Sequence, residues 1–183
     1  MIHSKDRSGW FGASDTARIM NRWDTPTFER FWLEKLGVYR SEFESLAMKT
    51  GTHLEGKVLD FLAVSHRDRQ IRLPSLLLRV NLDGEDQIIH EVKTHRRELF
   101  SVTRPYWMQA QVEMHAARKP LEIVAYRVLE EDYQNWLLPI DPGRLTRHSV
   151  PYDREWVETR YLPRLRYLAD CLRKGVWPSE IPC

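Results

Sequence analysis

Apolar side chains recur every three to four residues in three stretches of the first third of the chain, which predicts three amphipathic helices. The first begins at Ser14-Asp15, a pair typical of helix starts. The second opens at Thr25-Pro26, continues to about Leu36 and is stopped by Gly37. The third covers about residues 44–65, although two glycines within it weaken the helical pattern.

The middle of the chain changes to short apolar runs with partial alternation, which predicts strands over 76–82 and 87–93. Asp83-Gly84 lies between the two runs and predicts a hairpin connection. A helix over 105–118 is expected to follow.

The last third is expected to add strands over 121–129 and 136–140 and a long amphipathic helix over 153–174, kinked at Pro163 and ended by Gly175. The complete order of elements predicts an α/β fold, in which a small mixed sheet is flanked by helices. A length of 183 residues predicts a single domain over 1–183.

Composition narrows the class of protein. The chain is 42% hydrophobic and 30% charged, which is typical of a globular domain. It has no run of 18 apolar residues and no apolar segment near its N-terminus, so we expect a cytoplasmic protein without a membrane partner. Cys171 and Cys183 are too few for a disulfide framework, and the spacing of the histidines does not indicate a zinc site.

The net charge of +2 excludes a protein that coats nucleic acid through overall basicity. Basic residues nevertheless gather locally, as at Arg67, Arg69 and Arg72. Such patches contact phosphates in nucleic-acid-binding proteins, although a single cluster is more often solvated surface.

The residues that indicate a catalytic function lie between Asn81 and Thr94. Successive side chains of a strand alternate between its faces, so Glu91 and Lys93 share one face. Asp83, at the end of the preceding strand, is expected to fold back to the same face. Two carboxylates and one ammonium group then converge at a strand end.

This set of groups suits the hydrolysis of a phosphodiester. Carboxylates are the ligands that Mg²⁺ or Mn²⁺ prefers, and a bound cation activates water and stabilises the leaving oxygen. A lysine beside the cation orients the water and stabilises charge in the transition state. The peptide carbonyl of Val92 is a further candidate metal ligand.

The E-x-K tripeptide alone is more often a surface ion pair than a catalytic motif. Its neighbours make it more specific, because four segments in order resemble the PD-(D/E)XK nuclease superfamily, and within it the YqaJ-like viral recombinase family that includes the phage lambda exonuclease type. The segments are R-S-G-W-F-G-A-S-D at 7–15, G-T-H-L-E at 51–55, L-D-G through E-V-K at 82–93, and Y-W-M-Q-A-Q at 106–111.

The resemblance implies a restriction-endonuclease-like core and a role for each matching residue. Asp83 and Glu91 would be metal ligands, and Lys93 the catalytic lysine. Glu55 would lie near the metal from its helix, and Gln109 would point into the site from the following helix. Taken singly, Glu55 and Gln109 are more simply explained as solvated helix side chains.

The resemblance also implies a DNA-binding end of the site. Arg7 and Ser14 would bind DNA phosphate, which in the exonucleases is the terminal 5′-phosphate. Ser14 opens a helix, and helix N-termini bind anions, although a plain N-cap role is equally compatible.

The function implied is a 5′-to-3′ exonuclease that acts on the free ends of double-stranded DNA in phage-type recombination, in the host cytoplasm. Its partners would be a single-strand annealing protein and two further copies in a trimeric ring. Two alternatives stay open: a structure- or site-specific endonuclease with the same metal site, and a catalytically silent DNA-binding module.

Overall fold

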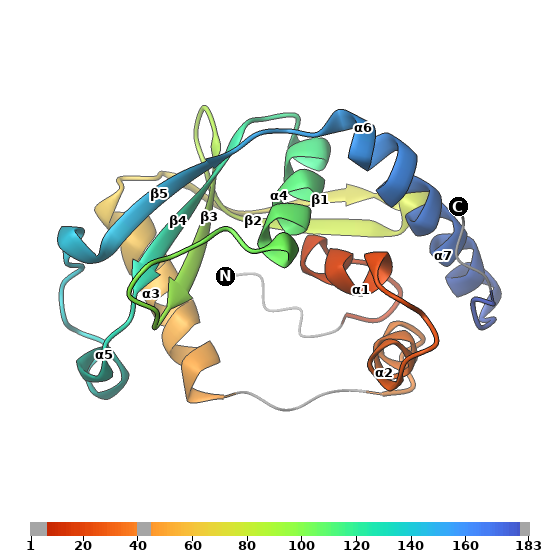
Figure 1. The fold of residues 1–183 in the computed structure, drawn as a ribbon, viewed down its shortest axis with the longest axis horizontal. Coiled ribbons are helices and arrows are strands. Elements are labelled where there is room, and N and C mark those ends of the chain that lie inside the picture. The colour runs from red at the N-terminus through yellow and green to blue at the C-terminus, as the bar shows by residue number, and fades with distance from the viewer. Residues whose placement is uncertain (1–6, 40–44, 180–183) are drawn as a thin grey trace.

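The computed structural model describes residues 7–39 and 45–179. In this part of the chain, five strands form one sheet in the order β1-β2-β3-β4-β5 (Figure 1). Among these five described strands only the β3–β4 pair is parallel, so the predicted mixed sheet is confirmed. The strands are β1 (His66–Leu73), β2 (Leu78–Glu85), β3 (Ile89–His95), β4 (Leu121–Arg127) and β5 (Leu145–Val150).

The helices cover both faces of the sheet. The predicted N-terminal helices are present, and the third ends four residues earlier than expected, while its predicted start at residue 44 lies outside the described residues. The helices are α1 (Thr16–Met20), α2 (Pro26–Lys35), α3 (Leu46–Phe61), α4 (Arg104–Ala117), α5 (Glu130–Gln134), α6 (Arg154–Trp156) and α7 (Leu162–Lys174). None of the described helices is long and apolar enough to cross a membrane.

Two apolar clusters hold these layers together. One joins α3 to Val92, Val124 and Tyr126 of the sheet. The larger cluster joins α1, α2, α4 and α7 to residues such as Ile89 and Ile123, which have the opposite parity along β3 and β4. Alternation along the strands therefore places α3 and α4 on opposite faces.

The expected turn at Asp83-Gly84 is wrong, because both residues lie inside β2 and the chain turns at 86–88 instead. A Cβ atom on Gly84 would lie 2.7 Å from Leu59 Cδ2 and 2.9 Å from Val64 Cγ1. Gly84 is therefore required by the close approach of α3 and the segment that follows it, and not by a turn.

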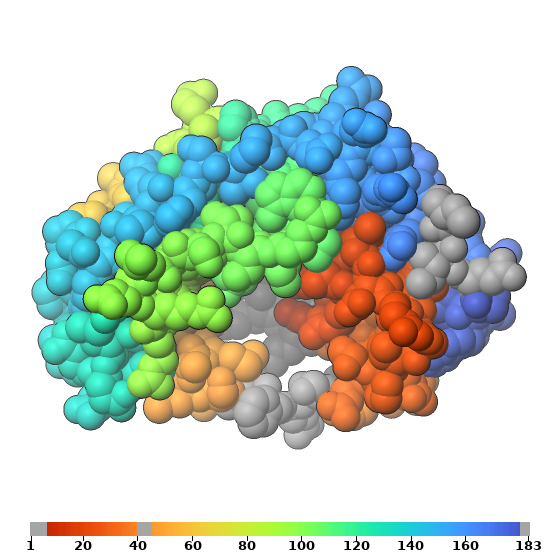
Figure 2. All heavy atoms as spheres, in the orientation of Figure 1, coloured from red at the N-terminus to blue at the C-terminus, as the bar shows by residue number. Residues whose placement is uncertain are grey.

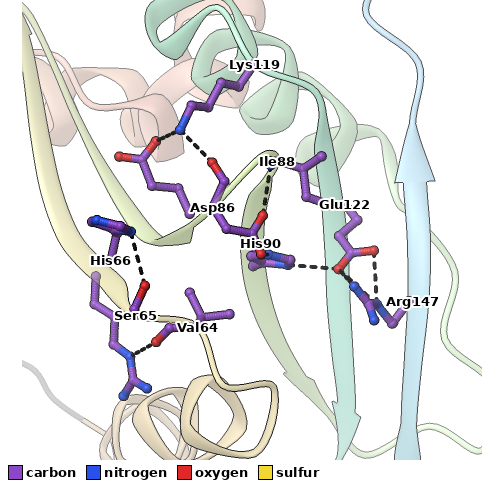
Figure 3. A network of polar contacts seen from close by, with 11 residues as sticks. Val64, Ser65, His66, Asp86, Ile88, His90, Lys119, Glu122 and Arg147 are labelled. Carbon is purple, nitrogen blue, oxygen red and sulfur yellow. Dashed lines mark hydrogen bonds and ion pairs between the residues drawn. The ribbon is translucent and has the colours of Figure 1, made fainter.

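Polar contacts surround the closed end of the β2–β3 hairpin (Figure 3). The buried His90 ring contacts Glu122 Oε1 through Nδ1 at 2.8 Å, and Glu122 also accepts hydrogen bonds from Arg147. Lys119 Nζ donates to the Asp86 carbonyl and to Glu85 Oε2, at 2.7 Å each. These contacts tie the turn at 86–88 to β4 and β5.

The strand predicted at 136–140 is also wrong, and β5 forms instead over Leu145–Val150. Trp136 turns toward α3, where its Nε1 donates to Thr50 Oγ1 at 3.1 Å. Its carbonyl accepts from Lys57 Nζ at 2.8 Å, and Pro139 has no N–H to give to a ladder. The start of the segment 136–140 therefore forms hydrogen bonds with side chains of α3 and not with a neighbouring strand.

The long C-terminal helix is present as one helical run with a local change of winding. A π segment, η4 (Val157–Tyr161), lies between α6 and α7, immediately before Pro163 in the first turn of α7. Gly175 ends α7 with φ of 65°, as predicted. Cys171 on α7 is a buried free thiol.

Candidate active site

A polar cavity of about 240 Å³ lies where β2 and β3 separate. Backbone pairing of the two strands is confined to the register Gly84–His90 and Glu85–Ile89, and beyond it they diverge (Figure 1). η1 (Ala13–Asp15) with α1, α3 and α4 border a hollow on the face seen in Figure 2. The cavity is lined by Gly12, Ala13, Ser14, Glu55, Arg79, Asn81, Asp83, Glu91, Val92, Lys93, Gln109 and Glu113.

Asp83 bridges the two strands at the point where their ladder stops. Its Oδ2 accepts the hydrogen bond of Val92 N at 2.9 Å. The carboxylate thus takes the place of a strand partner for a backbone N–H that would otherwise be unpaired. This contact brings Asp83 to the start of the E-x-K segment, as the sequence predicted.

Glu91 and Lys93 lie on the same face of β3 and contact each other directly. Lys93 Nζ donates to Glu91 Oε1 at 2.5 Å. Gln109 of α4 donates to the same oxygen through Nε2, at 2.6 Å. The second carboxylate oxygen, Glu91 Oε2, is buried and has no hydrogen-bond partner among the described residues.

Glu55 reaches the cavity from α3. Burial, followed by the negative charges of Glu91 and Asp68, raises the pKa of Glu55 to about 7. Burial together with Glu91 and Glu55 also raises the pKa of Asp83 well above its usual range. Burial opposes the charge of Lys93, but Glu91 and Asp83 outweigh it and raise the pKa of the lysine. The cavity therefore holds a crowded set of carboxyl groups around one ammonium group.

Glu113 belongs to the cavity and was not predicted. It lies one turn after Gln109 on α4, is fully buried, and accepts a hydrogen bond from Gln109 Nε2 at 2.8 Å. Burial and the charge of Glu91 raise the pKa of Glu113 well above its usual range. The four-residue spacing from Gln109 was the available signal, because residues i and i+4 share one face of a helix.

The carboxyl groups fit a hard divalent cation. Glu91 Oε2 and Glu113 Oε2 are both buried without a hydrogen-bond partner in the described chain. Burial, and after it repulsion from the Glu91 charge, raises the pKa of Asp83 and of Glu113. A cation would relieve that repulsion. In the described ranges, no group of three or more His, Cys, Asp or Glu side chains is arranged to hold a metal ion. Magnesium sites often use only one or two protein carboxylates, and water and phosphate complete the coordination. The carboxylates of this cavity can provide that protein contribution.

The segment 7–15 forms the other wall of the cavity through Gly12, Ala13 and Ser14. The exposed Ser14 lies in η1, whereas Arg7 is exposed and is absent from the residues that line the cavity. The buried Asp15 accepts from Gly12 N at 2.8 Å and pairs with Lys35 Nζ at 2.6 Å. Arg79 and Asn81 of β2 also line the cavity and were not predicted.

No family model matches the chain, and no curated protein matches it. Solved exonuclease structures, however, share its fold. A structure of LHK-Exo in complex with dAMP matches with a TM-score of 0.67 and 16% identity, over 93% of this chain and 91% of that chain. A structure of the alkaline exonuclease LHK-Exo from Laribacter hongkongensis matches with a TM-score of 0.61 and 15% identity, over 92% and 94% of the two chains. The predicted fold class is thereby confirmed.

Proposed function

We propose that this chain is a metal-dependent deoxyribonuclease of the PD-(D/E)XK type. One observation carries the proposal: Asp83, Glu91 and Lys93 converge at one polar cavity, at the point where β2 and β3 separate. The fold supports it, because the similar structures are those of an alkaline exonuclease, one of them in complex with the deoxynucleotide dAMP.

Asp83 and Glu91 would hold Mg²⁺, or Mn²⁺ in its place, with the Val92 carbonyl and Glu55 as additional oxygen donors at the same cavity. The cation would supply a water of lowered pKa and positive charge beside the phosphate. Glu91 holds the Lys93 ammonium group at 2.5 Å, and the raised lysine pKa keeps it protonated. In that state Lys93 orients the attacking water and stabilises charge on the phosphoryl oxygens. Gln109 fixes the Glu91 carboxylate from α4.

The direction we propose is 5′ to 3′, from free ends of double-stranded DNA. Ser14, Gly12 and Arg79 line the end of the cavity formed by η1 and β2, where a terminal phosphate would bind. The exposed Arg7 begins the same segment and would contact that phosphate from the rim. The partners proposed are a single-strand annealing protein and further copies of this chain in a trimeric ring, as part of phage-type recombination.

Digestion of end-labelled DNA tests this function. The substrates are linear duplex with a 5′-phosphate, the same duplex with a 5′-hydroxyl, nicked duplex and closed circular duplex, each with Mg²⁺, with Mn²⁺ and with EDTA. We expect metal-dependent release of nucleotides, fastest from the 5′-phosphorylated linear duplex, and an intact closed circle.

The other outcomes are equally informative. If the closed circle is cleaved at the rate of the linear duplex, the protein is an endonuclease that uses the same site and not an exonuclease. Release of no nucleotides from any substrate, with DNA binding retained, would show a silent DNA-binding module.

A further inference from the structure

Glu113 is a buried residue of α4 that lines the polar cavity beside Gln109. The residue is 0% exposed to bulk solvent, and its side chain and that of Gln109 both line the cavity. Oε1 accepts from Gln109 Nε2 at 2.8 Å, while Oε2 has no hydrogen-bond partner in the described ranges. A buried carboxyl group is costly, so its presence in the interior beside Gln109 indicates a role beyond packing.

The contact with Glu113 decides which end of the Gln109 amide faces Glu91. An amide NH₂ group has two hydrogens, and here one points to Glu91 Oε1 at 2.6 Å and the other to Glu113 Oε1 at 2.8 Å. The reversed amide would place its carbonyl oxygen against two carboxyl groups. Without Glu113, the reversed amide would meet only Glu91, so the preference for one orientation would weaken.

The amide orientation in turn decides which oxygen of Glu91 is available. Glu91 Oε1 receives both Gln109 Nε2 and Lys93 Nζ, which leaves Oε2 buried and unpartnered among the described residues. Two donors on one oxygen hold the carboxylate against rotation, so that the other oxygen keeps its direction. Partners of this kind, outside the ligands themselves, orient metal-binding carboxylates in proteins.

We propose that Glu113 is a positioning residue, which orients the Gln109 amide so that Glu91 Oε1 is occupied and Glu91 Oε2 is presented to a divalent cation. This inference rests on the proposed function, since it concerns the same cation. It adds a residue that neither the E-x-K segment nor the four resembling segments contains.

Titration of the full chain with Mn²⁺, followed by calorimetry or by the electron paramagnetic resonance signal of the free ion, tests the inference without an activity assay. Glu113→Met removes the acceptor at similar length, and we expect about a tenfold weaker Mn²⁺ affinity, the lower end of the range for such outer partners. Glu113→Gln keeps an acceptor oxygen for Gln109, and we expect its affinity to stay within about threefold of the wild type.

Two additional measurements separate positioning from a general loss of structure. Glu113→Met in a Gln109→Met background should weaken binding no further, because both substitutions break the same chain of contacts. In DNA cleavage, Glu113→Met should lower kcat with little change in KM. Should Glu113→Met not fold, Glu113→Ser, whose short side chain does not reach Gln109, takes its place.

The possible outcomes separate the role of Glu113 from the proposed nuclease function. Wild-type binding of Mn²⁺ together with equal binding by Glu113→Met overturns the role of Glu113 and leaves the nuclease proposal standing. An equal loss of Mn²⁺ affinity in Glu113→Met and Glu113→Gln would show that the charge of Glu113 matters and not its acceptor oxygen. That result would also overturn the positioning role of Glu113. Failure of the wild type to bind Mn²⁺ or Mg²⁺ contradicts the proposed function itself and the inference with it.

Discussion

At the scale of a single residue, the two carboxylate oxygens of Glu91 have different surroundings. One carboxylate oxygen receives Lys93 and Gln109, and the other is left without a partner in the described chain. Asp83 uses one oxygen for Val92 N. Each of these two carboxylates is therefore held by the protein through one oxygen, and its other oxygen suits a cation.

Asp83→Asn keeps the shape of the side chain and removes its charge. We expect the affinity for Mn²⁺ to fall by at least about tenfold, because an amide is a far weaker ligand for a hard cation than a carboxylate. Calorimetric titration of the purified variant measures it. Asn81→Asp, which adds a charge two residues away on the same strand, is the matched control and should not weaken binding. Unchanged affinity in Asp83→Asn would remove Asp83 from the metal site.

Glu55 makes the metal-free protein sensitive to pH. Its pKa in the folded state is about 7, against about 4.5 ordinarily, so the folded chain holds a proton that the unfolded chain has lost between these values. Stability therefore declines as pH rises through this window. Binding of a cation requires loss of that proton, so Mn²⁺ affinity should rise over the same range.

Thermal unfolding at pH 5, 7 and 8.5 checks this prediction, in EDTA and with Mn²⁺. The Tm of the wild type in EDTA should fall with pH relative to that of Glu55→Gln, and Mn²⁺ should restore it. Parallel Tm curves for the two proteins would mean that Glu55 does not titrate in this range.

At the scale of elements, close contacts between α3 and β2 and between η1 and α2 build the walls of the cavity. Gly84 allows α3 to lie against β2, and thereby brings Glu55 toward Asp83. The buried pair of Asp15 and Lys35 holds η1, and thereby Ser14, against α2. Both contacts can be tested by their effect on stability.

Gly84→Ala should destabilise the fold by about 1–3 kcal/mol, because its Cβ would overlap Leu59 and Val64. Urea unfolding measures the change. Gly56→Ala is the matched control: a Cβ atom there meets nothing within 4 Å, and a helical glycine replaced by alanine gains about 0.5–1 kcal/mol. Equal effects of the two substitutions would show that the close approach of α3 is not what requires Gly84.

Lys35→Met removes the buried ion-pair partner of Asp15 and leaves that carboxylate with the partly exposed Arg18 at 3.3 Å. We expect a loss of about 3 kcal/mol in the free energy of unfolding, the lower end of the range for a broken buried pair, because Arg18 still contacts Asp15. The double variant Lys35→Met with Asp15→Asn removes both charges and should recover much of that loss. If the double variant were no more stable than Lys35→Met, the pair would not be the source of the effect.

For the whole molecule, the sequence predicted the fold class and the convergence of Asp83, Glu91 and Lys93, because both depend largely on local periodicity. Alternation along one strand places Glu91 and Lys93 together, and helical spacing marks α2, α4 and α7. The polar edge strand β1 has no buried face to give it a period, and it was missed.

Elements that depend on distant partners were not predictable in the same way. Gly84 suggested a turn, and only the position of α3 reveals its purpose. The apolar segment that begins at Trp136 predicted a strand, but Trp136 instead forms hydrogen bonds with Thr50 and Lys57 of α3. Glu113 was passed over because the burial that makes it unusual depends on the tertiary fold.

The central claim is that Asp83, Glu91 and Lys93 form a metal-dependent nuclease centre. The most direct test compares nucleotide release from 5′-phosphorylated linear duplex by the wild type and by Lys93→Ala, with Mg²⁺ and with EDTA, while DNA binding is measured in parallel. We predict release by the wild type with Mg²⁺ alone, a rate lower by at least about 10²-fold in Lys93→Ala, and similar DNA binding by both. Equal release by the two proteins, or release by the wild type in EDTA, would contradict the claim.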